Sequence, residues 1–222
     1  MIMDKAEELI DQIVASPRAS NVGVLANDLL REFFRGYPIE RLKALLLSQD
    51  VDVVSTGIWI ASELGERNRP VLPDALALLD NPSKRVRFWA LDSLFWALPE
   101  RSYDLAKGVK MMEDVDPAVR WKALDFLTRA SADQLGSALS ALRSTEPNST
   151  HVRGLEYLLN PVSSDPQSAI SYLSSEDALL RKYGLVAAAR LPDRSNAALA
   201  HASLIDDADI QAFVRTRYRP PS

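Results

Sequence analysis

The 222-residue chain contains no cysteine, two histidines and eight glycines. Without cysteine, disulfides and thiol chemistry are excluded, and the composition fits a reducing cytoplasm. No run approaches the roughly 18 apolar residues that a membrane-spanning helix needs. The amphipathic first segment, Met1–Ser16, lacks the uninterrupted apolar stretch of a signal peptide. We therefore expect a cytoplasmic protein with no membrane span.

Motifs of catalysis and ligand binding are also missing. His151 and His201 have no metal-ligand neighbour at i+4, and a metal site needs three or four converging ligands, so we expect both on the surface. The chain has no glycine-rich phosphate loop and no Gly-x-Ser-x-Gly elbow. Asp92 and Asp125 could form a carboxylate pair from adjacent repeats, but solvated acids on a helix face are much commoner. The sequence predicts no enzyme, no metal and no cofactor.

The charge balance is mildly acidic, with a net charge of −4 and a pI near 5.3. A nucleic-acid partner would favour a basic face, so this balance argues against one. It favours a basic protein as the partner.

A repeated pattern runs through the chain, and a branched apolar anchor marks each copy. Val53, Val86, Val119 and Val152 are spaced 33 residues apart, Leu180 follows after 28 and Ile210 after 30. Three residues before each anchor stands a residue type that caps helix N-termini, because its side-chain oxygen accepts a free backbone N–H. These are Asp50, Ser83, Asp116, Ser149, Asp177 and Asp207. Four anchors are followed directly by arginine: Arg87, Arg120, Arg153 and Arg181.

Each anchored helix is expected to pair with a helix that precedes it. Prolines and capping residues delimit these first helices at about 39–48, 71–80, 103–113, 132–144, 166–174 and 195–205. No segment alternates with period two, so we expect no sheet. The prediction is a single all-α domain over residues 1–222, in which two capping helices within 1–37 precede about six helix pairs within 38–219. The repeat shortens after Asn148–Ser149 and Ser163–Ser164, where a bend or break is expected.

The pattern resembles the HEAT-repeat family. Asp116-Pro117-x-Val119-Arg120-x-x-Ala123-Leu124 is a close match to the motif of that family's second helix. Asn81–Leu91 matches with one extra residue, Asp177–Leu185 matches without the proline, and the Ser149 unit departs by placing Glu156 where a small residue is expected. The resemblance spans about residues 38–218 and implies a right-handed α-α superhelix, a solenoid. Since this fold hosts many functions, the resemblance alone assigns none.

Helical phase separates a core side from an outer side of each second helix. Positions 0, 4, 5, 8 and 12 from the anchor form the core side, for example Val119, Ala123, Leu124 and Leu127. A small residue at position 4, such as Gly57 or Gly184, would let the neighbouring helix approach closely. The arginine at position 1 should bond a capping carboxylate or a carbonyl of the next repeat, because a buried charge must be paired.

The outer side, at positions 2, 3, 6 and 10, gathers all four tryptophans among charged residues. Second helices usually line the concave binding surface of a solenoid, and tryptophan and arginine are enriched in interface hot spots. Trp59, Asp92 and Asp125 share position 6 and should form one stripe. The predicted partner-binding residues are Trp59, Glu63, Phe88, Trp89, Asp92, Trp96, Trp121, Asp125 and Arg129. The alternative is that the rings fill gaps between adjacent repeats.

Three hypotheses of function follow. The first is a non-catalytic module that binds a protein partner, a basic one, on its concave face. Gly57–Gly65 resembles a segment of bacterial HEAT-like proteins. Some of those proteins are immunity partners of toxins, so a toxin is the kind of partner that this resemblance implies. The second is a nucleic-acid enzyme similar to HEAT-like alkylpurine DNA glycosylases, which the acidic face disfavours because phosphate binding needs many lysines and arginines. The third is a structural assembly subunit.

Overall fold

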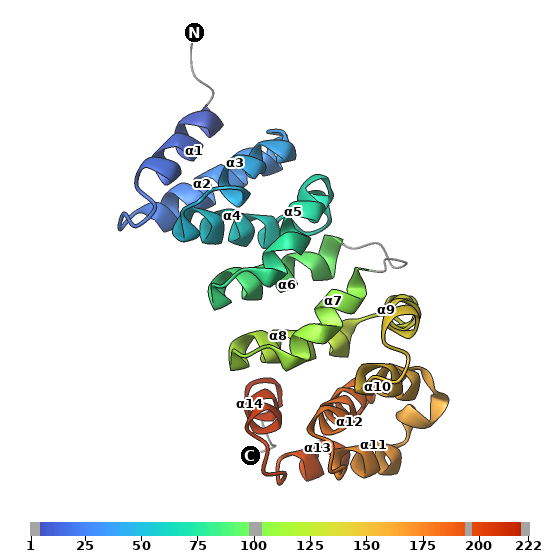
Figure 1. The fold of residues 1–222 in the computed structure, drawn as a ribbon. Helices are drawn as coiled ribbons and strands as arrows, with labels where there is room; N and C mark the ends of the chain where they lie inside the picture. The colour runs from blue at the N-terminus through green and yellow to red at the C-terminus, as the bar shows by residue number, and fades with distance from the viewer. Residues whose placement is uncertain (1–4, 98–103, 194–196, 219–222) are drawn as a thin grey trace. The chain divides into compact units, whose positions relative to one another are not determined.

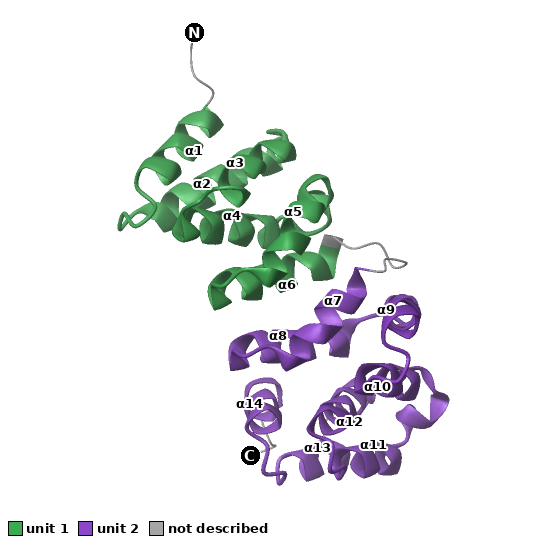
Figure 2. Ribbon diagram, in the orientation of Figure 1, with its two compact units in different colours: residues 1–98 green, residues 99–222 purple. Residues whose placement is uncertain are grey.

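The computed structural model describes residues 5–97, 104–193 and 197–218. These parts contain fourteen α-helices and five short 3-10 helices and no strand, as predicted (Figure 1). The chain divides into two compact units, residues 1–98 and 99–222 (Figure 2). None of the helices in the described ranges is long and apolar enough to cross a membrane. A single domain over residues 1–222 stays a prediction.

Unit 1 holds the two N-terminal helices and the first two helix pairs. Its α-helices are α1 (Lys5–Ala15), α2 (Val22–Phe34), α3 (Lys43–Leu46), α4 (Val51–Glu63), α5 (Leu72–Ala77) and α6 (Lys84–Ala97). The 3-10 helices η1 (Ile39–Leu42), η2 (Gly65–Val71) and η3 (Leu78–Asp80) make the first helix of each pair shorter and more irregular than predicted. Helices α2, α3 and α6 all pack on α4. Asn68 in η2 is buried and donates to the carbonyls of Ala61 in α4 and Ser93 in α6, which joins three elements.

Unit 2 holds the remaining four pairs. Its α-helices are α7 (Leu105–Lys110), α8 (Pro117–Arg129), α9 (Ala132–Thr145), α10 (Thr150–Leu159), α11 (Pro166–Leu173), α12 (Ala178–Arg190), α13 (Ala197–Ala202) and α14 (Ala208–Arg217), with 3-10 helices η4 (Met111–Glu113) and η5 (Pro161–Ser164). The helix starts predicted at residues 103 and 195 lie outside the described residues. The helices that the structure describes there begin at Leu105 and Ala197.

Capped N-termini fix where the second helices begin. Asp50, Asp116, Ser149, Asp177 and Asp207 each stand at the N-cap and accept a backbone N–H of the first turn through a side-chain oxygen. Of the anchors three residues later, Val53, Val119, Val152 and Ile210 are buried and Leu180 is half-buried. The repeat read from the sequence therefore marks the true starts of these helices.

The arginine after the anchor binds the loop that precedes its own helix. Nη1 of Arg120 donates to the carbonyls of Asp114 at 2.8 Å and Val115 at 3.1 Å. Arg87 and Arg181 bond the carbonyls five and six residues earlier in the same way. The predicted link to the next repeat's cap is found for Arg153, which pairs with Asp177 at 3.2 Å, and for Arg181, which pairs with Asp207 at 3.3 Å.

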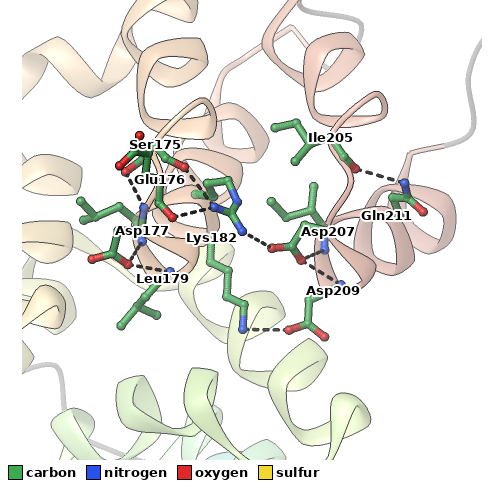
Figure 3. Close-up of polar contacts among 12 residues, drawn as sticks. Ser175, Glu176, Asp177, Leu179, Lys182, Ile205, Asp207, Asp209 and Gln211 are labelled. Carbon is green, nitrogen blue, oxygen red and sulfur yellow. Dashed lines mark hydrogen bonds and ion pairs between the residues drawn. The ribbon is translucent and has the colours of Figure 1, made fainter.

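Unit 2 departs from a simple succession of neighbouring repeats, because α8 packs against α12 and α14. Arg120 in α8 forms a bidentate pair with Asp209 in α14, at 2.7 and 2.9 Å. Lys182 in α12 is buried and joins the same carboxylate at 2.8 Å (Figure 3). Arg190 in α12 donates to the carbonyls of Leu127 and Ala130 at the end of α8. Helix α14 of the last repeat therefore packs directly on α8.

Close packing of helices depends on glycine at position 4 of two repeats. A Cβ at Gly184 would lie 2.6 Å from the backbone nitrogen of Leu173 in α11, and a Cβ at Gly57 would lie 2.7 Å from Cβ of Leu45 in α3. Real Cβ atoms do not approach other heavy atoms so closely, so any side chain would force the helices apart. The sequence prediction for these positions is confirmed.

We expect Gly184→Ala to lower the free energy of unfolding by roughly 1–3 kcal/mol, because overpacking a close contact with backbone strains the helix pair. The matched control is Gly136→Ala in α9, where a Cβ would meet no atom within 4 Å. That change should be neutral or stabilising, since alanine favours the helix over glycine by about 1 kcal/mol. Urea denaturation of both variants measures the difference. Equal effects would show that the α11–α12 approach is not constrained.

His151 in α10 is buried, which corrects the prediction that it is a surface residue. Its Nδ1 lies 3.0 Å from the hydroxyl of Tyr183 in α12, and its Nε2 lies 2.9 Å from a carboxylate oxygen of Glu113 in η4. Burial lowers the pKa of His151 from its ordinary 6.5, and this effect outweighs the opposing pull of the Glu113 carboxylate. The ring is therefore neutral at pH 7, and it donates through Nε2–H to Glu113 and accepts at Nδ1 from Tyr183.

This network predicts a loss of stability in mild acid. The unfolded chain takes up a proton near pH 6.5 that the folded ring resists, so stability is full above this pH and declines as the pH falls toward the lowered folded pKa. Denaturant midpoints of wild type and His151→Gln at about pH 7.5 and about pH 5.5 test this. The glutamine variant should lose less on acidification than wild type. An equal loss would assign the acid sensitivity to other groups.

Candidate functional site

The outer faces of α4 and α6 form one surface of unit 1, because these helices pack directly on each other. Trp59 and Glu63 lie one turn apart on α4. Helix α6 contributes Phe88, Trp89, Asp92 and Trp96. We call these six residues the α4–α6 surface, and all six belong to the predicted partner-binding set.

The side chains of this surface are unevenly exposed. Trp96 has 49% of its surface exposed and Glu63 is also exposed, whereas Trp59, Trp89 and Asp92 are half-buried. The ring of Trp89 meets that of Phe88 edge to face at a centroid distance of 5.1 Å. An exposed tryptophan and an exposed acid on two packed helices are suited to contact with another molecule.

A pocket of about 260 Å³ opens beside these tryptophans, between α2, α4 and α6. Its lining residues come from all three helices: Val22, Gly23, Ala26, Asn27, Thr56, Trp59, Arg85 and Trp89. Indole rings from α4 and α6 therefore wall a cavity whose opposite side is the first turns of α2. The Arg85 side chain is exposed, and the lining contains no carboxylate.

Sequence reasoning had placed Trp59 and Trp89 in the site but had missed Arg85 and the α2 wall. Arg85 stands four residues before Trp89, so helical spacing alone could have placed both on one face. Nothing in the pattern of the repeats could have shown α2 as the third wall, because α2 lies outside the repeat and its contact with α4 is tertiary.

The corresponding face of α8, in unit 2, is covered by α14. The indole N–H of Trp121 donates to the hydroxyl of Thr216 at 2.8 Å. Its ring meets Phe213 at 5.7 Å, and the guanidinium of Arg217 lies over it at 5.4 Å. For Trp121 these contacts favour the alternative interpretation, in which the ring fills a gap between repeats.

Asp125 differs from the sequence prediction. It was expected to be a solvated acid, but its side chain is 1% exposed and forms ion pairs with Arg129 in α8 and Arg217 in α14. The solvated interpretation is wrong because Asp125 faces the packed α14. The proposed stripe also falls on two units, with Trp59 and Asp92 in unit 1 and Asp125 in unit 2, and its continuity stays a prediction.

Metal and acid–base chemistry find little support in the described residues. No group of three or more histidine, aspartate or glutamate side chains that could hold a metal ion occurs among them. His151 is held by Tyr183 and Glu113, and His201 lies 3.2 Å from the hydroxyl of Ser174. The carboxylate of Asp125 is neutralised by arginines, so it is not available as half of a catalytic pair with Asp92.

We expect Asp125→Asn to lower the free energy of unfolding by about 2 kcal/mol or more, because two arginines would lose a buried anionic partner. Glu63→Gln is the control, since Glu63 is exposed, and it should change stability by less than about 0.5 kcal/mol. Chemical denaturation followed by far-UV circular dichroism measures both. A neutral Asp125→Asn would mean that the contact of α14 with α8 contributes little.

Comparisons with known proteins give the fold but no family. A scan against protein-family models and a search of curated proteins found no match. Among solved structures, the chain is similar to an engineered protein, with 16% identity, a TM-score of 0.51 and coverage of 96% of this chain and 94% of that one. It is also similar to a designed armadillo repeat protein in complex with the peptide (KR)4, with 13% identity, a TM-score of 0.50 and coverage of 96% and 97%. The chain is an all-α, HEAT/armadillo-like helical solenoid.

Proposed function

We propose that this protein is a non-catalytic interaction module that binds a protein or peptide partner on the α4–α6 surface of unit 1. The observation that carries the proposal is the pairing of exposed Trp96 and Glu63 with a pocket walled by Trp59 and Trp89. Aromatic anchors beside a concave pocket are typical of interface hot spots. The similar designed armadillo repeat protein is itself a peptide complex, which agrees with this kind of partner.

A basic partner is favoured by a contact within unit 2, in which an arginine of α14 binds the outer face of α8. Asp125, at position 6 of α8, pairs with Arg217, which also lies over the ring of Trp121 at position 2. On α6 the same two positions are Asp92 and Phe88, again an acid beside an aromatic ring. The contact of α14 with α8 thus shows, within this chain, an arginine bound to a helix face that carries an acid beside an aromatic ring. An arginine or lysine of the partner would lie beside the exposed Glu63.

The finer form of the proposal is an immunity-type role, in which a bacterial cytoplasmic protein covers and neutralises a toxin. Its support is the resemblance of Gly57–Gly65, because this segment covers the C-terminal half of α4, ends at the first residue of η2, and includes both Trp59 and Glu63. Neither nucleic-acid catalysis nor a purely structural role gains a specific observation from the described residues.

The test compares capture of partners by wild type and by two surface variants, Trp96→Ala and Glu63→Lys. Loss of a hot-spot tryptophan typically costs about 2 kcal/mol, or roughly 30-fold in affinity. Reversing Glu63 should repel a basic partner and slow its association. Quantitative mass spectrometry of the captured proteins, followed by calorimetry with each recovered partner, gives both effects.

Two matched controls keep the result specific. Leu204→Ala removes an apolar side chain that is 82% exposed in unit 2, and Glu40→Lys reverses an exposed acid in η1. Both should bind like wild type. If the surface variants also bind like wild type, the α4–α6 surface is not the binding site.

A further inference from the structure

The pocket between α2, α4 and α6 is rich in hydrogen-bond donors and has no anionic group in its lining. Among the described residues, neither the Arg85 guanidinium nor the indole N–H of Trp59 or Trp89 has a hydrogen-bond or ion-pair partner. Asn27 adds a side-chain amide, of which one N–H is used at 2.7 Å by the carbonyl of Gly23. Thr56 already donates its hydroxyl to the carbonyl of Asp52. The guanidinium of Arg85 is therefore a donor of the lining that has no acceptor among the described residues.

We propose that this pocket is a subsite for a carboxylate carried on an apolar or aromatic body, namely an acidic side chain or the chain terminus of the bound partner. The inference rests on the proposed function, since it names what the partner places beside Trp59 and Trp89. A guanidinium offers paired N–H groups that match the two oxygens of a carboxylate. The indole walls would cover the apolar part of the same residue.

Other occupants fit the pocket less well. A cationic group would be repelled by Arg85 and would find no carboxylate in the lining, although tryptophan faces attract cations. A phosphorylated residue carries nearly two charges and is usually bound by a cluster of arginines, whereas this lining holds one. A volume of about 260 Å³ lies below the 300–1,000 Å³ typical of pockets for whole small ligands, so it suits a single side chain.

The subsite gives the partner segment a direction. Arg85, Trp89, Asp92 and Trp96 follow one another along one face of α6, so the face changes from positive near its start to negative farther on. Seven residues of helix separate Arg85 from Asp92, about 10 Å at 1.5 Å per residue. An extended segment covers this distance in about three residues. The acidic residue of the partner would lie in the pocket, and the residue about three positions away would lie over this later part of α6.

The experiment uses the full chain and three short probes. Acetyl-Phe-Glu-amide presents a side-chain carboxylate, acetyl-Gln-Phe presents a terminal carboxylate, and acetyl-Phe-Gln-amide is the neutral control. Two-dimensional NMR follows the four indole N–H signals, which are assigned with single Trp→Phe variants. We expect the Trp59 and Trp89 signals to shift with both acidic probes. The neutral probe should need at least a tenfold higher concentration to give the same shift. The signal of Trp121, whose N–H is bonded to Thr216, should stay in place. The tighter of the two acidic probes identifies which carboxylate source the pocket prefers.

Two variants test the pocket itself. Arg85→Gln should weaken the acidic probes at least tenfold, while Arg69→Gln, at an exposed arginine of η2, should not. Gly23→Leu should also block the probes, because Gly23 lines the pocket and a Cβ there meets no atom within 4 Å. Gly136→Leu is its control, at an equally open helical glycine of unit 2.

Failure of this inference differs from failure of the proposed function. If the neutral probe shifts Trp59 and Trp89 as much as the acidic ones, if no probe shifts them, or if Arg85→Gln binds like wild type, the carboxylate subsite is wrong. Partner capture that still depends on Trp96 and Glu63 would then leave the proposed function standing. Acidic probes that bind the pocket while Trp96→Ala and Glu63→Lys capture normally would overturn the proposed function and leave the subsite.

Discussion

The arginine that follows four of the six anchors is the interaction on which the order of the repeats depends. In Arg87, Arg120 and Arg181 the guanidinium returns to two carbonyls of the preceding loop, so each loop is fastened to the helix that follows it. In Arg153 and Arg181 the guanidinium pairs with the capping aspartate of the next repeat, Asp177 and Asp207 respectively. The side chain of Arg181 therefore holds both the turn that begins its own repeat helix and the junction to the next repeat.

The outer faces of α6 and α8 differ in what covers them. Both helices carry an aromatic residue at position 2 and an aspartate at position 6. In unit 2, two ion pairs join α8 to α14: Arg120 pairs with Asp209, and Asp125 pairs with Arg217. The face of α8 is then filled by the chain itself. Trp96 on α6 keeps 49% of its surface exposed, so it is still available for another molecule.

Much of the fold could be predicted from the sequence because its determinants are local. N-caps, anchors and small residues recur at fixed spacing, and each acts on its own helix or on the neighbouring one. The contact of α14 with α8 was not foreseen beyond an expected bend, since it depends on Asp209 and Arg120, which are 89 residues apart. Asp125 was misjudged for the same reason: helical phase shows the direction of a side chain but not what lies opposite it. Helical phase alone places Trp59 and Trp89 on the outer side of their helices. The pocket also needs the wall formed by α2, and no feature of the repeat pattern indicates that wall.

A surface that is positive at one end and negative at the other selects partners more sharply than an acidic face alone. A uniformly basic segment would pair with the exposed Glu63 but would also place a cation near Arg85, where no carboxylate of the pocket lining offsets the repulsion. A segment whose acidic residue is suitably spaced from a basic residue avoids this repulsion. Its carboxylate would accept hydrogen bonds from the donors of the pocket. Specificity is a difference between such alternatives, and a misplaced charge contributes to it as much as a well-placed one. Under the proposed function, the mild overall acidity of the chain would favour encounter with basic proteins, while Arg85 would select those that carry a suitably placed carboxylate.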